Sequence, residues 1–299
     1  KCENLVKVEI PLNSNLQTIE SNTFSWSEIK EIFIPPNVSK ICESAFDNCR
    51  NLVKVEIPPN SNLQTIESNA FSWTEIEEIY FPASLKELKD GWCFGANRLK
   101  KINISSSNNK FIFKDNKYLL GKSDENENEN EFDILHFASR DIKEISIPSN
   151  IKIISSYAFY DCINLTKIEI SKNSNLQTIG SHAFAWSTIK EIFILPNVTK
   201  IGGSAFESCD NLTKVEIPQN SNLQTIESST FSATPIEKIF IPPNVTKIGR
   251  SAFENCKNLI KVEISKNSNL QTIESKAFSR TKIEEIFIPP NVTKICESA

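Results

Sequence analysis

The chain is built from a tandem repeat. Residues 209–255 and the 47 residues before them, 162–208, are near copies of each other, and the same repeat recurs on both sides. Each repeat has two halves, and each half carries a short Ile/Val-rich run such as KVEI or EIFI. Twelve such runs end 23 or 24 residues apart, except for one step of 43 residues between Ile104 and Ile147. A fixed period of this size predicts a solenoid in which each coil packs only against its neighbours.

Alternate residues of each run point to opposite faces of a strand, so one set forms the core and the other faces outward. One outward column alternates between Glu and Lys from run to run, except at Lys238. Opposite charges one strand apart are expected to pair across the strands. The second outward column carries aromatic residues in alternate runs, interrupted near the middle of the chain: Phe33, Tyr80, Phe193, Phe240 and Phe287.

Two interpretations of these five aromatic residues remain open. In one, flanking Lys and Glu stems shelter each ring and the ring serves only stability. In the other, the rings are anchors of a protein-binding surface on a concave sheet. A variable corner position holds Trp26, Trp73 and Trp186, followed by Ala233 and Arg280. Because a core site would not exchange Trp for Arg, the Trp residues are expected at the surface, either lying on a neighbouring loop or forming an edge for contacts.

Each run is followed by a turn with Asn, a short extended piece such as LQTIE, and a corner that ends in AF or a similar pair. At most one helical turn is expected between the corner and the next run. The Phe residues of the corners are predicted to fill the core: Phe24, Phe46, Phe71, Phe159, Phe184, Phe206, Phe231, Phe253 and Phe278.

The chain has eight cysteines, and their spacing argues against disulfides. Cys162, Cys209 and Cys256 lie two runs apart, which places them roughly 10 Å from one another if parallel strands stack at ~4.8 Å. That distance is beyond disulfide reach, so we expect buried free thiols. Cys42 and Cys49 are near enough in sequence to bridge within one turn, but the fold does not require it. There is no CxxC motif, so no zinc site is expected.

The longest step between runs contains an insertion at residues 105–136. The segment FIFKDNKYLLG (111–121) is predicted to be a small hairpin that turns at Asp115-Asn116. The segment DENENENE (124–131) is acidic and of low complexity, which predicts a solvated tip. An insertion of this length is either a tolerated decoration or a functional feature.

The segment IPPNVTKIGRSAFENCKNL (241–259) resembles the BspA-type leucine-rich repeat, whose pattern is IP-x-x-V-x-x-I-x-x-x-AF-x-x-C-x-x-L. The match recurs in most repeats. It departs at ELKDGWCFGANRL (87–99), where one extra residue is expected and Cys93 is expected in the usual place of Ala. It departs again at the insertion, after which FASRDI (137–142) has the spacing of a regular corner.

The resemblance implies a mainly β fold that forms one domain over residues 1–299. The expected architecture is a right-handed, curved leucine-rich repeat solenoid of about twelve repeats, with a concave parallel β-sheet, short convex strands and 3-10 or helical turns. The resemblance also implies a surface antigen or adhesin-like role in mucosal bacteria and protists, at the cell surface or secreted.

Little in the sequence favours catalysis or nucleic-acid binding. The net charge is −4 without a basic stripe, which argues against a nucleic-acid partner. The only histidines, His136 and His182, have no nearby Ser or Cys in a plausible triad, and the seven glycines form no phosphate loop. We therefore expect no enzyme activity, no catalytic or metal-binding residues and no cofactor.

Two functions remain open. The first is a surface-exposed module that binds a protein of the host cell surface or matrix. The second is a structural or intracellular scaffold without an adhesive role. Both ends of the sequence fall inside repeats, so we expect a piece of a longer array, and no signal peptide or membrane span is seen in it. The runs at 7–10 and 285–288 are then unprotected edges, which predicts end-to-end self-association.

Overall fold

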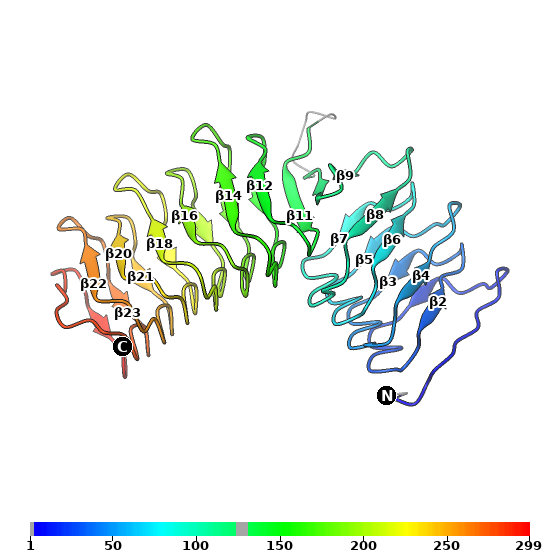
Figure 1. The fold of residues 1–299 in the computed structure, drawn as a ribbon, viewed down its shortest axis with the longest axis horizontal. Helices are drawn as coiled ribbons and strands as arrows, with labels where there is room; N and C mark the ends of the chain where they lie inside the picture. The colour runs from blue at the N-terminus through cyan, green and yellow to red at the C-terminus, as the bar shows by residue number, and fades with distance from the viewer. Residues whose placement is uncertain (1–2, 124–130) are drawn as a thin grey trace. The chain divides into compact units, whose positions relative to one another are not determined.

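The computed structural model describes residues 3–123 and 131–299. Cys2 and most of the predicted acidic tip, residues 124–130, lie outside the described residues. The chain is an all-strand β-solenoid of about twelve turns with parallel sheets (Figure 1). No helix occurs in the described ranges, so none of these residues forms an apolar helix that could cross a bilayer.

The chain divides into two compact units. Unit 1 comprises residues 1–132 and 136–140, and unit 2 comprises residues 133–135 and 141–299. Within each unit, a typical coil has one long strand, a turn, one short strand and a corner. The long strands follow one another along the stack of coils, and so do the short strands (Figure 1).

The long strands correspond to the predicted KVEI and EIFI runs. They are β2 (Glu31–Phe33), β4 (Lys54–Glu56), β6 (Glu78–Phe81) and β8 (Lys101–Ile104) in unit 1, and β12 (Glu144–Ile147), β14 (Lys167–Ile170), β16 (Glu191–Phe193), β18 (Lys214–Glu216), β20 (Lys238–Ile241) and β22 (Lys261–Ile264) in unit 2. Their Ile, Val and Phe side chains at the second and fourth positions point into the core, and the intervening side chains face outward.

The long strands form parallel pairs rather than one continuous sheet: β2 with β4, β6 with β8, β12 with β14, β16 with β18 and β20 with β22. The two strands of a pair begin 23 residues apart. Within each unit, the second strand of one pair and the first strand of the next pair begin 24 residues apart. The strands that are not hydrogen-bonded to each other are therefore the ones separated by the longer coil. The predicted strands at 7–10 and 285–288 form no ladder, because neither has the 23-residue partner within the described chain.

The short strands carry the inward Ile predicted for the LQTIE and VTKIG segments, with Leu88 in its place in one strand and with Ile295 exposed in the last coil. They are β1 (Thr18–Ile19), β3 (Lys40–Ile41), β5 (Thr65–Ile66) and β7 (Glu87–Leu88) in unit 1, and β13 (Ile153–Ile154), β15 (Thr178–Ile179), β17 (Lys200–Ile201), β19 (Thr225–Ile226), β21 (Lys247–Ile248), β23 (Thr272–Ile273) and β24 (Lys294–Ile295) in unit 2. These strands pair in parallel in longer series than the long strands do, in the orders β1-β3-β5-β7, β13-β15-β17 and β19-β21-β23-β24.

Tight turns close the corners, and no helix forms there among the described residues, within the predicted limit of one helical turn at most. In the first corner the Ser25 amide donates to the carbonyl of Asn22, three residues back, at 3.3 Å. The Phe24 amide donates instead to the carbonyl of Ala45 in the next coil, at 2.8 Å. Positive φ angles at Asn22 (59°) and Trp26 (64°) make this alternation between local and inter-coil hydrogen bonds possible.

The corner Phe residues pack in the core, as predicted, and their rings stack on one another from coil to coil. Neighbouring ring centroids lie 4.8 to 5.5 Å apart in unit 2, with ring planes within 12° of parallel. The stacks are Phe24–Phe46–Phe71 in unit 1 and Phe159–Phe184–Phe206–Phe231–Phe253–Phe278 in unit 2. Each interior ring is thereby covered on both faces.

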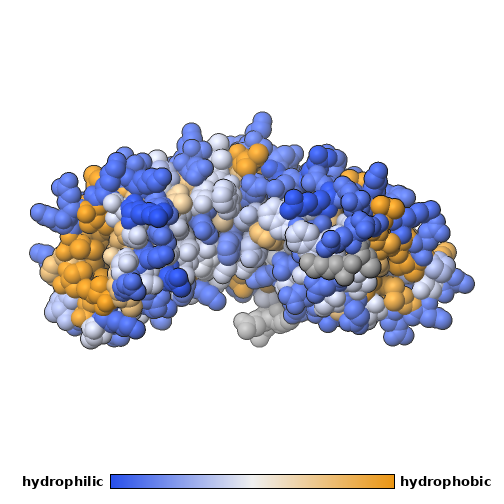
Figure 2. Space-filling model, turned by 90° about the horizontal axis from the view of Figure 1, so that it is seen from below, coloured by the Kyte–Doolittle hydropathy of each residue, from blue (hydrophilic) through white to orange (hydrophobic). Residues whose placement is uncertain are grey.

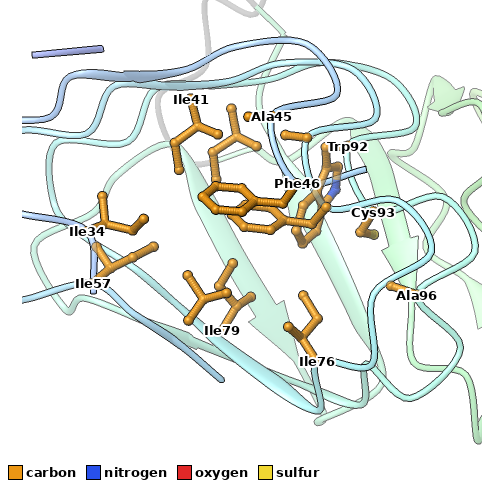
Figure 3. Close-up of a cluster of buried hydrophobic side chains, with 14 of the residues drawn as sticks. Ile34, Ile41, Ala45, Phe46, Ile57, Ile76, Ile79, Trp92, Cys93 and Ala96 are labelled. Atoms are coloured by element: carbon orange, nitrogen blue, oxygen red, sulfur yellow. The ribbon is translucent and has the colours of Figure 1, made fainter. Parts of the chain in front are cut away.

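The coil that contains Trp92 departs from this pattern, in a different way from the prediction. Phe46 donates its amide hydrogen to Ala70, and Phe71 donates to Trp92, so Trp92 takes the place of Ala and Cys93 takes the place of Phe. The predicted extra residue is absent, and the assignment of Cys93 to the Ala position is wrong. The indole of Trp92 is 2% exposed and fills the core beside the small Cys93 side chain (Figure 3).

The cysteines of the described chain are free, as predicted: Cys42, Cys49, Cys93, Cys162, Cys209, Cys256 and Cys296. All of them are buried except Cys296. The thiol of Cys209 donates to the carbonyl of Phe184 at 3.0 Å, and burial raises the pKa of this thiol to about 12. A thiol with such a pKa stays protonated at neutral pH and serves as a small core residue.

The insertion contains the predicted hairpin. Strands β9 (Phe111–Lys114) and β10 (Tyr118–Gly121) pair in antiparallel register, with Lys114 opposite Tyr118. Three residues, Asp115 to Lys117, connect these partners, and the Lys117 amide donates to the Lys114 carbonyl at 2.9 Å. Asp115 and Asn116, at the centre of this turn, have φ angles of 54° and 52°, both positive as in a type I′ turn. Phe111 is 3% exposed, and its ring lies 6.1 Å from that of Phe81, so the hairpin is part of the core of unit 1.

Asn108 joins the start of the insertion to the preceding coil. Its side-chain amide donates to the carbonyls of Pro82 at 2.8 Å and Leu85 at 3.0 Å. Its side-chain oxygen accepts hydrogen bonds from the amides of Lys110 and Phe111, both at 2.9 Å. One side chain thus satisfies four backbone groups where the regular coil pattern is interrupted.

The corner predicted at residues 137–142 does not form. Phe137 and Ala138 lie instead in strand β11 (Ile134–Ala138), whose first two residues pair in parallel with β13. The Phe137 ring is 1% exposed and lies 6.2 Å from Trp92, and the guanidinium of Arg140 lies 4.8 Å from its centre. The spacing is that of a corner, but the backbone is extended.

Candidate functional site

The outward side chains of the long strands form the candidate site, which we name the Lys/Glu face. Its charged column comprises Glu31, Lys54, Glu78 and Lys101 in unit 1, and Glu144, Lys167, Glu191, Lys214, Lys238 and Lys261 in unit 2. Its second column comprises Phe33, Glu56, Tyr80 and Asn103 in unit 1, and Ser146, Glu169, Phe193, Glu216, Phe240 and Glu263 in unit 2. The strand alternation that buries Ile and Val therefore sets these side chains outward.

The five aromatic residues predicted from the repeat all lie outside the core. Phe193 is 40% exposed and Phe287 is 56% exposed, whereas Phe33, Tyr80 and Phe240 are half-buried. Phe287 extends the second column beyond β22, within the residues that form no ladder. Partial exposure leaves both interpretations of these rings open, so their role in binding remains a prediction.

Hollows lie between the aromatic side chains. In unit 2 a hollow of about 360 Å³ is lined by Phe193 and Phe240, with Val215, Lys214 and Lys238 among its other residues. In unit 1 a hollow of about 580 Å³ is lined by residues that include Tyr80, Val53, Lys54, Glu78 and Lys101. Both hollows combine apolar lining with charged residues.

Charges on the face pair more often along a strand than across strands. Lys54 bonds to Glu56 at 3.2 Å, and Lys214 bonds to Glu216 at 2.6 Å. The predicted cross-strand pairing occurs between Lys101 and Glu78 at 3.2 Å, and more loosely in unit 2. A lysine two residues from a glutamate on the same face reaches it as easily as it reaches the next strand.

The hydrogen bonds of these pairs shift the titration of their members. The pKa of Lys214 is raised by its hydrogen bond to Glu216, and the pKa of Glu263 is lowered by its hydrogen bond to Lys261. All of these groups are solvent-exposed, so each pair adds little to stability. They hold the face charged at neutral pH.

The three Trp residues lie at corners with left-handed backbone conformation. Trp26 is 45% exposed with φ 64°, and Trp186 is 52% exposed with φ 62°. Trp73 is half-buried, and its ring packs so closely on Gly95 that a Cβ atom there would lie 2.7 Å from it. The sequence predicts their surface position. A contact role for these edges remains a prediction.

One aromatic pair at the corners of unit 2 is not signalled by the repeat pattern. The His182 ring stacks on Tyr157, with centroids 4.9 Å apart and planes 9° from parallel. Burial lowers the pKa of His182, and the negative charge of Glu207 opposes this only in part. Its Nδ1 atom is buried and has no hydrogen-bond partner among the described residues.

Stability is expected to fall when the pH is lowered through the titration range of His182. The unfolded chain binds a proton near pH 6.5, whereas the folded chain resists protonation, so acid favours unfolding. Urea unfolding at pH 7.5 and pH 5.0 measures this loss. The variant His182→Asn, which carries the residue found at Asn22 and Asn69, should lose less stability between the two pH values. An equal loss in both proteins would contradict the assignment to His182.

No metal site is evident in the part of the chain that the structure describes: no three His, Cys, Asp or Glu side chains there are grouped to hold an ion.

Comparison with known proteins gives a consistent fold assignment. A leucine-rich repeat protein from Eubacterium ventriosum has TM-score 0.74 and 23% identity, covering 96% of this chain and 81% of that one. A leucine rich cell surface protein from Faecalibacterium prausnitzii has TM-score 0.63 and 21% identity, with coverages of 94% and 63%. The pneumococcal vaccine antigen PcpA has TM-score 0.60 and 22% identity, with coverages of 95% and 66%.

The chain thus spans less than two thirds of the length of the last two structures, and at these identities the likeness shows the fold alone. No curated protein matches the chain. The model of the BspA type leucine rich repeat region matches in six copies, over residues 1–119, 135–260 and 177–299. Since these matches cover nearly every residue, the chain belongs to the BspA-type leucine-rich repeat family.

Proposed function

We propose that the chain is a non-enzymatic binding module that attaches to a protein of the host cell surface or matrix through its Lys/Glu face. This function places it at the cell surface or among secreted proteins. The observation that carries the proposal is the position of Phe193 on this face, 40% exposed beside a hollow of about 360 Å³. Exposed aromatic rings beside hollows are typical anchor sites for protein partners.

The spacing of the rings supports a protein partner. Phe193 and Phe240 lie two long strands apart, which corresponds to roughly 10 Å along the stack. Charge pairs such as Lys214–Glu216 surround them. Apolar anchors within a polar rim are the usual composition of a protein–protein interface. Family membership and a typically non-enzymatic fold are compatible with this function.

A structural or intracellular scaffold is the second candidate. The observation that favours it is the partial burial of Phe33, Tyr80 and Phe240. Rings covered in this way by neighbouring stems contribute to stability without any partner. The two candidates differ in what happens when the rings are removed.

Replacing both Phe193 and Phe240 by Ser tests the proposed function. Binding of labelled protein to epithelial cells and to basement-membrane extract should weaken by more than ~2 kcal/mol, as loss of anchor residues does. Because both rings lie outside the core, the unfolding midpoint should change little. Protease treatment of the cells should abolish wild-type binding if the partner is a protein. Leu12→Ser, which removes a 66% exposed side chain from a turn, is the matched control.

The alternatives give distinct results in this experiment. Unfolding of the double Ser variant would show that the rings are structural and would favour the scaffold. Unchanged binding by a folded double variant would exclude this part of the face as the site. If deletion of residues 124–131 abolishes binding while the double variant binds normally, the insertion is the site.

Self-association through the end coils is a separate part of the proposal. The last coils of unit 2 leave Ile286 37%, Ile288 38% and Ile295 56% exposed. Figure 2 shows hydrophobic surface gathered at the end where Figure 1 places the last strands. Light scattering is expected to give a mass above 33.8 kDa that rises with concentration. Ile286→Lys with Ile288→Lys should restore the monomer mass, and a wild-type chain that stays monomeric at high concentration would contradict the expectation.

A further inference from the structure

Two lysines face each other on the Lys/Glu face of unit 2. Lys238 of β20 and Lys261 of β22 are register partners (the strands are labelled in Figure 1). The corresponding partners in the other long-strand pairs carry opposite charges: Glu31–Lys54, Glu78–Lys101, Glu144–Lys167 and Glu191–Lys214. Like charges directly opposite each other destabilise a strand pair. A carboxylate at position 238 would therefore make this strand pair more stable than Lys238 does.

The two lysines differ in their own partners. Lys261 bonds to Glu263 on the same strand at 2.5 Å. Among the ion pairs of the described residues, none includes Lys238. Lys238 is exposed, and Glu263, whose carboxylate feels the charge of Lys238, is already bonded to Lys261. The Lys238 ammonium group is therefore available to an anion from outside the chain.

The free ammonium group stands beside an apolar hollow. Lys238 lines the hollow of about 360 Å³ together with Phe193, Phe240, Val215 and Ile217. A ligand side chain between the two rings would thus place its neighbouring groups within reach of a cation. The unit 1 hollow differs, because Glu78 there is already bonded to Lys101 across the strands.

We propose that this hollow binds an extended segment of a protein partner in which an apolar side chain is followed or preceded by an acidic residue. The apolar side chain fills the space between Phe193 and Phe240, and the carboxylate pairs with Lys238. This inference rests on the proposed function and names the chemistry of its partner. Glu216 and Glu263 also line the hollow and would repel a continuous polyanion, so a single acidic residue next to an apolar one fits better than a nucleic acid.

Peptide selection tests the inference on the whole chain. A random 12-residue peptide library displayed on phage is panned against the wild-type protein. Enriched peptides are synthesised, and their affinities are measured by fluorescence anisotropy, each beside a copy in which the acidic residue is changed to its amide. The protein variants are Lys238→Glu, the Phe193→Ser/Phe240→Ser double variant and Lys200→Glu. Lys200 is an exposed residue of β17 outside the Lys/Glu face, so its variant controls for net charge.

We expect enriched peptides to carry Asp or Glu next to an apolar residue. Changing that acid to its amide should weaken binding to the wild type and to Lys200→Glu about two- to fivefold, within the range of an exposed ion pair. The same change should have little effect on binding to Lys238→Glu. That variant should also unfold at the same or a higher temperature than the wild type, because it restores the opposite charge across from Lys261.

Each of the other possible outcomes contradicts the inference alone or both the inference and the proposed binding face. Peptides that require Phe193 and Phe240 but bind equally with acid or amide overturn the inference and leave the proposed function intact. A lower unfolding temperature for Lys238→Glu also overturns the inference, because Lys238 would then be a stabilising residue. If no peptide is enriched, or none depends on the two rings, the inference and the proposed binding face both fail.

Discussion

Replacing Phe206 by Ala is expected to lower the free energy of unfolding by about 3–5 kcal/mol, the usual loss for a buried Phe. The Phe206 ring is completely buried and lies between Phe184 at 5.3 Å and Phe231 at 5.4 Å. Its removal leaves a cavity and uncovers one face of each neighbouring ring. Because each coil is stabilised by the coils on either side, two interfaces weaken at once. Urea unfolding followed by circular dichroism measures the loss.

Phe278 provides the matched control for Phe206. Among the described residues it stacks only on Phe253, and it is half-buried. Phe278→Ala should therefore cost clearly less than Phe206→Ala. Equal losses at both positions, or a loss below about 1 kcal/mol for Phe206→Ala, would show that stacking between coils is not what stabilises the core.

Replacing Asn108 by Ala is expected to cost about 2–4 kcal/mol, because it removes four hydrogen bonds and leaves backbone groups of a partly buried turn without partners. Two of these groups, the carbonyls of Pro82 and Leu85, belong to the preceding coil. The β9–β10 hairpin should loosen as well, since the amide of Phe111 loses its acceptor. Thermal unfolding gives the loss of stability, and hydrogen exchange at residues 111–121 reports on the hairpin.

The adjacent Asn109 provides a control in which Asn is also replaced by Ala, but without the loss of the four hydrogen bonds. Asn109 is exposed, so Asn109→Ala should change stability by less than about 0.5 kcal/mol. Asn108→Ser should recover part of the loss, because Ser occupies the corresponding place at Ser61 and Ser174, where its hydroxyl accepts from the amide two residues on. Identical stabilities for Asn108→Ala and Asn109→Ala would exclude the proposed role of Asn108.

Much of the fold could be predicted because each coil repeats the same pattern of inward and outward residues. The 23–24-residue period, the inward Ile residues and the Phe residues of the core follow directly from the pattern. The hairpin turn at Asp115 and Asn116 was also predictable, because few residue pairs adopt two successive positive φ angles. The burial of Phe111 was not, since no other coil offers a template for the insertion.

The wrong or missing predictions concern features that depend on contacts between neighbouring coils, which the pattern within one coil does not show. Periodicity could not show that long strands pair in twos, because a one-residue difference in coil length leaves the side-chain pattern unchanged. The pattern placed Cys93 at the Ala position. In the structure Trp92 holds the Ala position and Cys93 the Phe position, so a large residue followed by a small one fills the core where other coils have a small residue followed by a large one. At residues 137–142 the spacing of a corner was preserved although the backbone is extended.

The candidate site was predictable in its composition but not in its contacts. The alternation of the strands places Phe193, Phe240 and the charged column on the outer face. It does not tell which carboxylate a flexible lysine selects, so the bond between Lys214 and Glu216 had to come from the structure. The like-charged partners Lys238 and Lys261 were visible as a break in the column, and only the structure places the first of them beside a hollow.

The pairing of long strands in twos bears on how a gene for such a chain can grow or shrink. Recombination between repeats can remove 47 residues, which are two coils with their two long strands. The strands that then become neighbours are of opposite types, as they were before the deletion. Removal of a single coil of 23 or 24 residues would bring two strands of the same type together, with lysine against lysine or glutamate against glutamate. Array length in this protein is therefore expected to change in steps of two coils, because single-coil products begin with a mismatched junction.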